Sequence, residues 1–398
     1  MHVAWLGKKT PFCGNVTYGR EVTHALRDRG HRVSFLHFTA GEAAPPDASH
    51  GNEIAIPCLY KSQIYTIPTL ASRQVLVQAL ETLAPDLVHA SLTLSPLDFQ
   101  LPEICQSLDL PLIATFHPPF DSKVRSLKSS TQYLAYQVYA PCLARYDRVI
   151  IFSQAQHDLL VRLGVPPEKV VIIPNGVDGE KYRPGAATYP NPFKIQYNAE
   201  RLFLYMGRIS AEKNVEALLK AWRAVKSGNM LGNTLGDRAK LLIVGDGPLR
   251  PLLSQQYGSS EGVLWHGFEG DEARRINLLR SADVFILPSL VEGLSLALLE
   301  AMACGVACLA TDAGADGEVL ADGAGIVLDP QRVTEQLKTL LPLCCEHPEL
   351  TELLGIKARQ RVLTHYTLNH NITQIESQYR QLVQIPTVNY RYQAWVPY

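Results

Sequence analysis

The 398-residue sequence lacks several features that mark common classes of protein. It has no run of eighteen apolar residues, so we expect no transmembrane helix. It does not open with a basic segment and a long apolar core, so we expect no signal peptide. Its 37 basic residues nearly balance 38 acidic ones, which gives no global electrostatic case for nucleic acid. Its eight cysteines form no Cys-x-x-Cys pair, so we expect buried free thiols in a reducing cytoplasm.

The most informative stretch of the sequence runs from Pro288 to Gly305. It follows an apolar run, 284–287, that predicts a buried strand, and it restarts as a helix with Ser295 as N-cap. Glu292 therefore lies on the loop before the helix, and Glu300 lies in its second turn. The amides of residues 293–296 are predicted to point outward at the helix N-terminus, where they can hold an anion.

The frame Glu-Gly-x-Ser-x-x-x-x-Glu-Ala-Met-Ala-Cys-Gly in this stretch resembles the signature of family 4 retaining glycosyltransferases, which have the GT-B fold. Three further segments agree with that family in order and spacing, namely Ile173–Asp178, Met206–Asn214 and Val244–Pro248. The resemblance is dense from about residue 145 to 330. It implies an α/β protein with two Rossmann-like, doubly wound domains that face each other across a cleft.

The length of the chain and its alternation of apolar runs with helical patterns agree with two domains. We predict an N-terminal, acceptor-binding domain over residues 1–180 plus 375–398, in which the last part is a helix that crosses back. The C-terminal, nucleotide-sugar-binding domain is predicted over residues 181–374.

Two residues of the first domain follow predicted strands at the edge where doubly wound sheets bind ligands. Gly14 opens a helix, in the sequence Cys13-Gly14-Asn15 where the family usually carries a Gly-Gly pair. His117 follows the strand 112–115, a place where a histidine is ordinarily structural. The resemblance implies instead that His117 contacts the donor sugar.

The second domain supplies two cations, Arg208 and Lys213, on the loop after the strand 202–205. A pyrophosphate needs its charges countered, and Arg and Lys both do so. The resemblance implies that Glu300 binds the ribose hydroxyls and that Glu292 binds the sugar hydroxyls. The predicted catalytic residues are Glu292, His117, Arg208 and Lys213. The predicted donor-binding residues are Gly14, Gly207, Arg208, Lys213, Gly245, Gly293, Leu294, Ser295, Leu296 and Glu300.

No Asp-x-Asp motif, the metal-holding motif of the other main sugar-transferase fold, occurs in the sequence. Fixed cations and helix dipoles would replace the metal, so we predict transfer without a metal or other cofactor. The family resemblance favours attack of the acceptor from the same face as the leaving group. Double displacement with Glu292 as nucleophile stays open.

Residues 120–145 begin with three cations, Lys123, Arg125 and Lys128, and continue with tyrosines at 133, 136 and 139. This pattern suits either a membrane surface with anionic lipid or a core helix with a solvated start. The segments 4–20 and 115–121 are similar to cyanobacterial-type digalactosyldiacylglycerol synthases.

These observations predict a peripheral enzyme on the cytoplasmic face of a membrane. It would move a hexose from UDP-galactose or another UDP-hexose to a glycolipid such as monogalactosyldiacylglycerol. The alternative is a family 4 transferase with a soluble sugar or polysaccharide acceptor. A nucleotide-sugar epimerase and a silent sugar-nucleotide binder fit less well, because Arg208, Lys213, Glu292 and Glu300 are all present.

Overall fold

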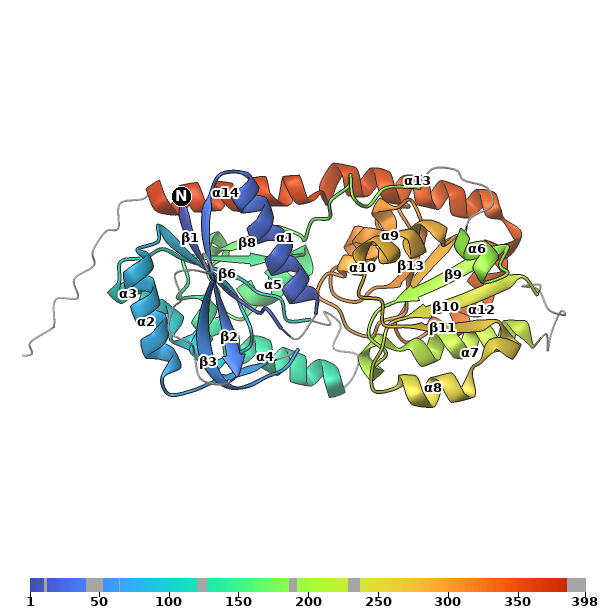
Figure 1. The fold of residues 1–398 in the computed structure, drawn as a ribbon, viewed down its shortest axis with the longest axis horizontal. Helices are drawn as coiled ribbons and strands as arrows, with labels where there is room; N and C mark the ends of the chain where they lie inside the picture. Colours follow the sequence, from blue (N-terminus) through green and yellow to red (C-terminus); the bar gives the residue numbers. More distant parts are fainter. Residues whose placement is uncertain are drawn as a thin grey trace, which may run out of the picture.

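The computed structural model describes residues 1–10, 13–40, 53–63, 65–119, 127–185, 192–227 and 237–384; of residues 127–132 and 384 it describes the backbone. The chain forms two lobes that lie side by side, each built around one sheet with helices on its faces (Figure 1). This is the two-domain α/β architecture that the sequence predicts.

The first lobe contains an eight-stranded sheet in the order β4-β3-β2-β1-β5-β6-β7-β8. Its strand pairs are parallel, except that β3 and β4 are antiparallel. The strands are β1 (His2–Gly7), β2 (Arg32–Ala40), β3 (Glu53–Lys61), β4 (Thr66–Pro68), β5 (Leu87–Ser91), β6 (Leu112–Thr115), β7 (Arg148–Ile151) and β8 (Val170–Ile172). The helices of this part of the chain are α1 (Gly14–Asp28), α2 (Ser72–Leu83), α3 (Leu101–Ser107), α4 (Leu127–Leu143) and α5 (Gln154–Arg162).

The second lobe contains a six-stranded parallel sheet in the order β11-β10-β9-β12-β13-β14. The strands are β9 (Arg201–Met206), β10 (Ala239–Val244), β11 (Val263–Gly267), β12 (Val284–Leu287), β13 (Ala307–Thr311) and β14 (Ile326–Leu328). The helices that follow β8 are α6 (Pro192–Gln196), α7 (Val215–Lys226), α8 (Arg250–Gln256), α9 (Glu272–Ser281), α10 (Leu296–Ala303), α11 (Asp316–Val319), α12 (Val333–Glu346), α13 (Pro348–His365) and α14 (Leu368–Gln384). Short 3₁₀ turns lie at Pro96–Phe99, Pro167–Lys169, Ala211–Lys213 and Ser259–Glu261.

Central strands of both sheets are buried on both faces rather than on alternate residues, because helices cover both faces of each sheet. In β9, for example, residues 202–206 are all buried. The eight cysteines are free, and six of them are buried in the protein interior.

The last two helices run along one side of both lobes (Figure 1). Helix α14 packs on the first lobe, where Ile372, Ile375 and Tyr379 share a core cluster with Trp5 of β1. The return to the first lobe begins with α14 at Leu368, before the residue 375 that the sequence suggests. Residues 385–398 of the predicted first domain lie outside the described part of the chain.

Both sheets reverse their strand order at one point, between β1 and β5 in the first lobe and between β9 and β12 in the second. In doubly wound sheets the loops at such a point open a crevice at the carboxyl ends of the strands, and ligands bind there. The predicted site residues follow these strands or their neighbours.

Candidate active site

In the second lobe, three loops at the carboxyl edge of the sheet are bound together through their backbones. Leu290, after β12, donates its amide to the carbonyl of Glu212, after β9, at 2.8 Å. Ala315, after β13, donates to the carbonyl of Gly293 at 2.8 Å. Gly314 lies so close to the Glu292 and Gly293 carbonyls that a Cβ would not fit, and its φ of +60° also favours glycine. The sheet therefore holds these loops in one rigid arrangement.

Glu292 and Lys213 form an ion pair at the reversal point of this sheet. The Nζ of Lys213 lies 2.5 Å from Oε1 of Glu292, and the hydroxyl of Ser289 donates to the same oxygen at 2.7 Å. Glu292 is only 8% exposed, so the pair is largely shielded from water. Arg208 lies at the rim instead: its side chain is 42% exposed, and its nearest ion-pair partner, Glu212, is 3.9 Å away. The structure thus brings two of the predicted catalytic residues together and leaves Arg208 partly exposed at the rim.

Ser295 is the N-cap of α10, as predicted, since its hydroxyl accepts a hydrogen bond from the amide of Leu298 at 3.3 Å. The prediction that all the amides of residues 293–296 are open to an anion is wrong for Ser295. Its amide donates to Oδ1 of Asp316 at 2.9 Å, because α11 places that carboxyl directly at the start of α10. A carboxyl group therefore already occupies part of the anion site.

Asp316 is a site residue that the sequence did not reveal. Its side chain is fully buried, and Oδ2 has no hydrogen-bond partner within the described part of the chain. Burial, and then the charge of Glu292, raise the pKa of Asp316 well above its usual range. The sequence of residues 312–318 indicates only a loop, and an aspartate in a Gly-containing loop carries no further signal.

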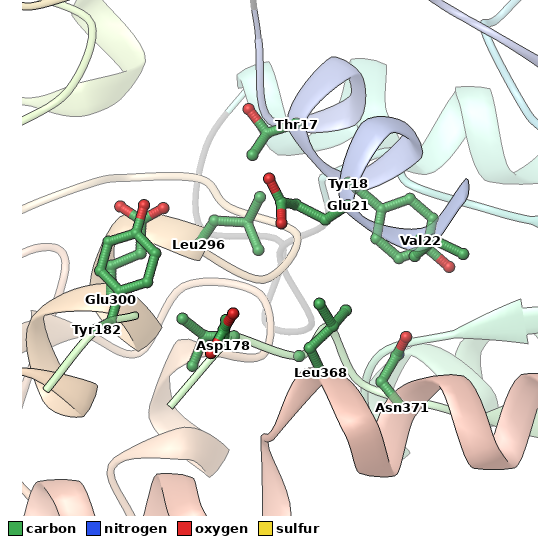
Figure 2. Close-up of a pocket in the computed structure, with 12 residues that line it drawn as sticks. Thr17, Tyr18, Glu21, Val22, Asp178, Tyr182, Leu296, Glu300, Leu368 and Asn371 are labelled. Atoms are coloured by element: carbon green, nitrogen blue, oxygen red, sulfur yellow. The ribbon is translucent and has the colours of Figure 1, made fainter. Parts of the chain in front are cut away.

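Glu300 lies in a narrow pocket between the lobes (Figure 2). The picture places it beside Tyr182, with Glu21 of α1 facing Leu296 nearby. Burial raises the pKa of Glu300 to about 7, although Arg275 and a hydrogen bond from Tyr182 act in the opposite direction. The group is thus balanced between its neutral and ionised forms near neutral pH, and only the ionised form accepts two hydroxyl hydrogen bonds with both oxygens.

His117 lies across the cleft, directly against the Glu292 loop. A Cβ on Gly293 would be 3.1 Å from the carbonyl oxygen of His117. The His117 ring packs edge-on to Tyr18, with 4.9 Å between centroids, and Nε2 is 2.9 Å from the hydroxyl of Ser91. Burial, and then the charge of Lys8, lower the pKa of His117 to about 3, so the ring is neutral at physiological pH.

The remaining predicted donor residues are glycines and amides on the same loops. Gly14 is the first residue of α1 and is exposed, with open space where a side chain would be. Gly207 and Gly245 follow β9 and β10, and the backbone of Gly245, at φ +135°, approaches Gly207 too closely for a Cβ. Leu294 accepts a hydrogen bond at its carbonyl from Asn175 of the first lobe at 3.3 Å, and Leu296 begins α10.

The predicted membrane residues stay largely untested. Lys123 and Arg125 lie outside the described residues, as does the side chain of Lys128. Two of the three tyrosines of α4 are not available to a membrane: Tyr136 and Tyr139 are buried, and their hydroxyls donate to the carbonyl of Pro118 and to Asp98, whereas Tyr133 is exposed. These two rings complete the core of the first lobe.

The described residues also bear on metals and membranes. No group of three or more His, Cys, Asp or Glu side chains among them is arranged to hold a metal ion. None of the helices in the described ranges combines the length and the apolar character that crossing a membrane requires.

Two family models match successive parts of the chain. Residues 14–181 match Glycosyltransferase Family 4, and residues 191–361 match Glycosyl transferases group 1. Both halves of the chain therefore match glycosyltransferase models.

Three curated relatives have names that specify a sugar transfer. A UDP-Gal:alpha-D-GlcNAc-diphosphoundecaprenol alpha-1,3-galactosyltransferase of Escherichia coli is 25% identical over 61% of this chain and 62% of its own length. The sulfoquinovosyl transferase SQD2 of Arabidopsis thaliana is 24% identical over 84% of this chain and 64% of its own length. A phosphatidyl-myo-inositol mannosyltransferase of Mycolicibacterium smegmatis is 28% identical over 86% of this chain and 83% of its own length. The chain thus spans less than two thirds of the length of the first two.

Solved structures confirm the GT-B fold. HepE of Anabaena in complex with UDP-glucose superposes with a TM-score of 0.75 over 96% of this chain and all of that chain, at 18% identity. Sucrose-phosphate synthase of Thermosynechococcus elongatus gives 0.72 over 96% and 98%, at 21% identity.

Proposed function

We propose that this chain, whose two halves match glycosyltransferase models, moves a hexose from a UDP-sugar to a membrane glycolipid with retention of configuration. The observation that carries this proposal is the buried pair Lys213–Glu292 at the reversal point of the second sheet, with His117 against its loop. A cation and a carboxylate at that point suit a substrate with a pyrophosphate next to a sugar.

The donor pyrophosphate would lie between Lys213 and Arg208. As the bond between the anomeric carbon and the phosphate oxygen breaks, negative charge grows on the leaving phosphate, and these two cations stabilise it. Lys213 is already oriented by Glu292, so little reorganisation is needed. The exposed Arg208 can swing onto the phosphate and form two hydrogen bonds. In this proposal no metal takes part.

Glu292 would accept hydrogen bonds from the sugar hydroxyls, and Glu300 from the ribose. The acceptor hydroxyl attacks the anomeric carbon on the face that the phosphate leaves, and its proton passes to the departing phosphate oxygen. This course leaves Glu292 to orient the sugar, in agreement with its tight pairing to Lys213 and Ser289.

Two observations support a lipid acceptor. The names of two relatives specify acceptors linked to undecaprenol diphosphate and to phosphatidyl-myo-inositol. Helix α4 of the first lobe also exposes Tyr133, Leu134 and Val138, the last two four residues apart on one face and each more than half exposed. Such a face can enter the interface of a bilayer. Galactose as the sugar and monogalactosyldiacylglycerol as the acceptor rest on the sequence resemblance.

The test is transfer of radiolabelled galactose from UDP-galactose to a lipid extract in the presence of EDTA. Wild type is compared with Glu300→Ala and with Glu352→Ala, which changes an exposed glutamate of α13 far from the cleft. We expect a labelled lipid with wild type and with Glu352→Ala, and none with Glu300→Ala. A requirement for a divalent ion would overturn the metal-free account. Transfer to soluble sugars alone would overturn the lipid acceptor and favour the alternative of a soluble or polysaccharide acceptor.

A further inference from the structure

Three polar side chains connect the reversal point of the first sheet to His117. Ser91, at the end of β5, donates its hydroxyl proton to Oδ1 of Asn15 at 2.7 Å. The amide nitrogen of Asn15, in α1, donates to the carbonyl oxygen of Leu92 at 3.2 Å. The hydroxyl of Ser91 also lies 2.9 Å from Nε2 of His117, after β6. One chain of hydrogen bonds thus joins the loops that follow three neighbouring strands.

The direction of every hydrogen bond in this chain is fixed by the carbonyl of Leu92. A carbonyl oxygen can only accept, so the Asn15 group that faces it must be the NH₂. The Oδ1 of Asn15 then faces Ser91 and takes the single hydroxyl proton of that residue. The Ser91 oxygen has no proton left for His117, so it must accept one from Nε2.

We propose that Asn15 and Ser91 are positioning residues that hold neutral His117 in the tautomer protonated at Nε2, which leaves Nδ1 as an acceptor for a hydroxyl group of the donor sugar. This inference rests on the proposed function only for the identity of the hydroxyl group. The ring is partly exposed, and Nδ1 has no hydrogen-bond partner among the residues that the structure describes. Nδ1 is therefore the ring nitrogen that a ligand can reach.

The surroundings of His117 keep the ring in one orientation and uncharged. Tyr18 and Phe152 pack against it, with centroids 4.9 and 5.3 Å away. The charged and titratable groups around it are Lys8, which is 5% exposed, and the buried His89, which is neutral itself. Burial of much of the ring and a positive neighbour both disfavour a second proton on it. His117 can therefore accept a hydrogen bond from a hydroxyl group but carries no charge to attract a phosphate.

The chemistry on this side of the cleft selects for a hydroxyl group on the sugar. A donor that lacks the hydroxyl facing Nδ1 would leave the nitrogen without a partner, and such a loss discriminates more strongly than a change of shape in an apolar pocket. Asn15, in the first turn of α1 immediately after Gly14, thus has a role in specificity that the sequence does not suggest.

The first test observes the tautomer of His117 directly by NMR. The protein is labelled with ¹⁵N-histidine, long-range ¹H–¹⁵N NMR spectra are recorded between pH 6 and 8, and His117→Gln identifies the signals. We expect a protonated Nε2 and an unprotonated Nδ1 for His117 in wild type, and the same pattern in Ser91→Thr, which keeps the hydroxyl. Ser91→Ala should show a mixture of tautomers. A wild-type ring protonated at Nδ1, or an unchanged tautomer in Ser91→Ala, would overturn the inference.

The second readout uses the donor. Addition of UDP-hexose should shift the Nδ1 signal of wild type, and Ser91→Ala should lower kcat/KM about tenfold, with activity restored in Ser91→Thr. Donor binding that leaves the Nδ1 signal unmoved would contradict the role of Nδ1. If UDP-hexose does not bind at all, the proposed function fails, whereas the tautomer result in the free protein still stands by itself.

Discussion

The two sides of the cleft differ in the charge of the groups that they present. The second lobe presents charge: Lys213 and Glu292 form a shielded ion pair, and Asp316 adds a buried carboxyl next to it. The first lobe presents neutral hydrogen-bonding groups, because His117 is held without charge between Ser91 and two aromatic rings. A charged pyrophosphate is bound by the charged groups of the second lobe. A sugar hydroxyl is best recognised by the neutral hydrogen-bonding groups of the first lobe. We infer that affinity arises mostly on one side and selectivity on the other.

The largest effect should follow from breaking the ion pair. Lys213→Met removes a cation from the growing phosphate charge, and we expect kcat to fall about 10²–10³-fold, as for loss of one group that stabilises a transition state. It also leaves Glu292 unpaired and buried, so Tm should fall.

The double variant Lys213→Met/Glu292→Gln separates the two consequences. Thermal unfolding should show recovery of Tm, while kcat stays low. Lys338→Met, on an exposed helix surface, is the control and should behave as wild type. If kcat recovered along with Tm, the cation would be needed for folding rather than for catalysis.

The comparison also predicts which side makes binding depend on pH. Glu300 has a pKa of about 7, and in our proposal the ionised form binds the ribose hydroxyls, so the Kd of UDP should rise about tenfold for each pH unit below 7. His117, with a pKa of about 3, adds no dependence in that range.

Isothermal titration of UDP between pH 5 and 8 measures this effect. Glu300→Gln should bind weakly at every pH, and His117→Gln should keep the wild-type profile. A profile that became flat in His117→Gln would reverse the assignment of the two sides.

A smaller effect concerns stability, and it has opposite signs on the two sides. Asp316 has a raised pKa, so the folded state holds a proton that the unfolded state has lost, and stability falls as pH rises above the usual carboxyl pKa. The slope of one such group is about 1.4 kcal/mol per pH unit. His117 has a lowered pKa, so it makes the protein less stable as pH falls from about 6.5 toward 3.

Urea unfolding of wild type, Asp316→Asn and His117→Gln at several pH values tests both signs. Asp316→Asn keeps an oxygen for the Ser295 amide, and its stability should fall less than that of wild type as pH rises above the usual carboxyl pKa. His117→Gln should be less sensitive to acid. An unchanged slope of stability against rising pH in Asp316→Asn would mean that the carboxyl is ionised in the folded protein.

The smallest effect is expected on the outer surface, where the proposal assigns lipid contact to the first lobe. Leu134→Ser/Val138→Ser should weaken sedimentation with anionic liposomes several-fold, because two apolar side chains no longer enter the interface. Leu353→Ser/Ile356→Ser, a similarly exposed pair on α13 of the second lobe, should have no effect. An equal loss of liposome binding in both variants would contradict the assignment of lipid contact to the α4 surface.

Much of the fold and part of the site could be read from local sequence. Short apolar runs such as 284–287 indicate strands, because a strand covered by helices on both faces is apolar at successive residues. Ser295 caps α10 because a hydroxyl at that position satisfies a free amide. Glu292 and Glu300 were placed correctly on the loop and in the helix, since both follow from the same short pattern.

Contacts between distant segments could not be read in this way. The helical spacing of Tyr136 and Tyr139 suited either a membrane surface or a core helix, and only the packing of α4 against the sheet, which buries both rings, decided between the two. Nothing local predicts that Asp316 takes the amide of Ser295, or that Asn15 directs Ser91 and His117.

The sequence by itself determined the alternation of strands and helices and the loops that carry Lys213, Glu292 and His117, because these depend on residues within one turn or one strand. Only the tertiary structure decided which charges are paired, which amide is occupied and which nitrogen of His117 is left for a ligand. Those properties depend on how strands far apart in the chain align at the carboxyl edges of two sheets. They also depend on the dry surroundings that packing creates there.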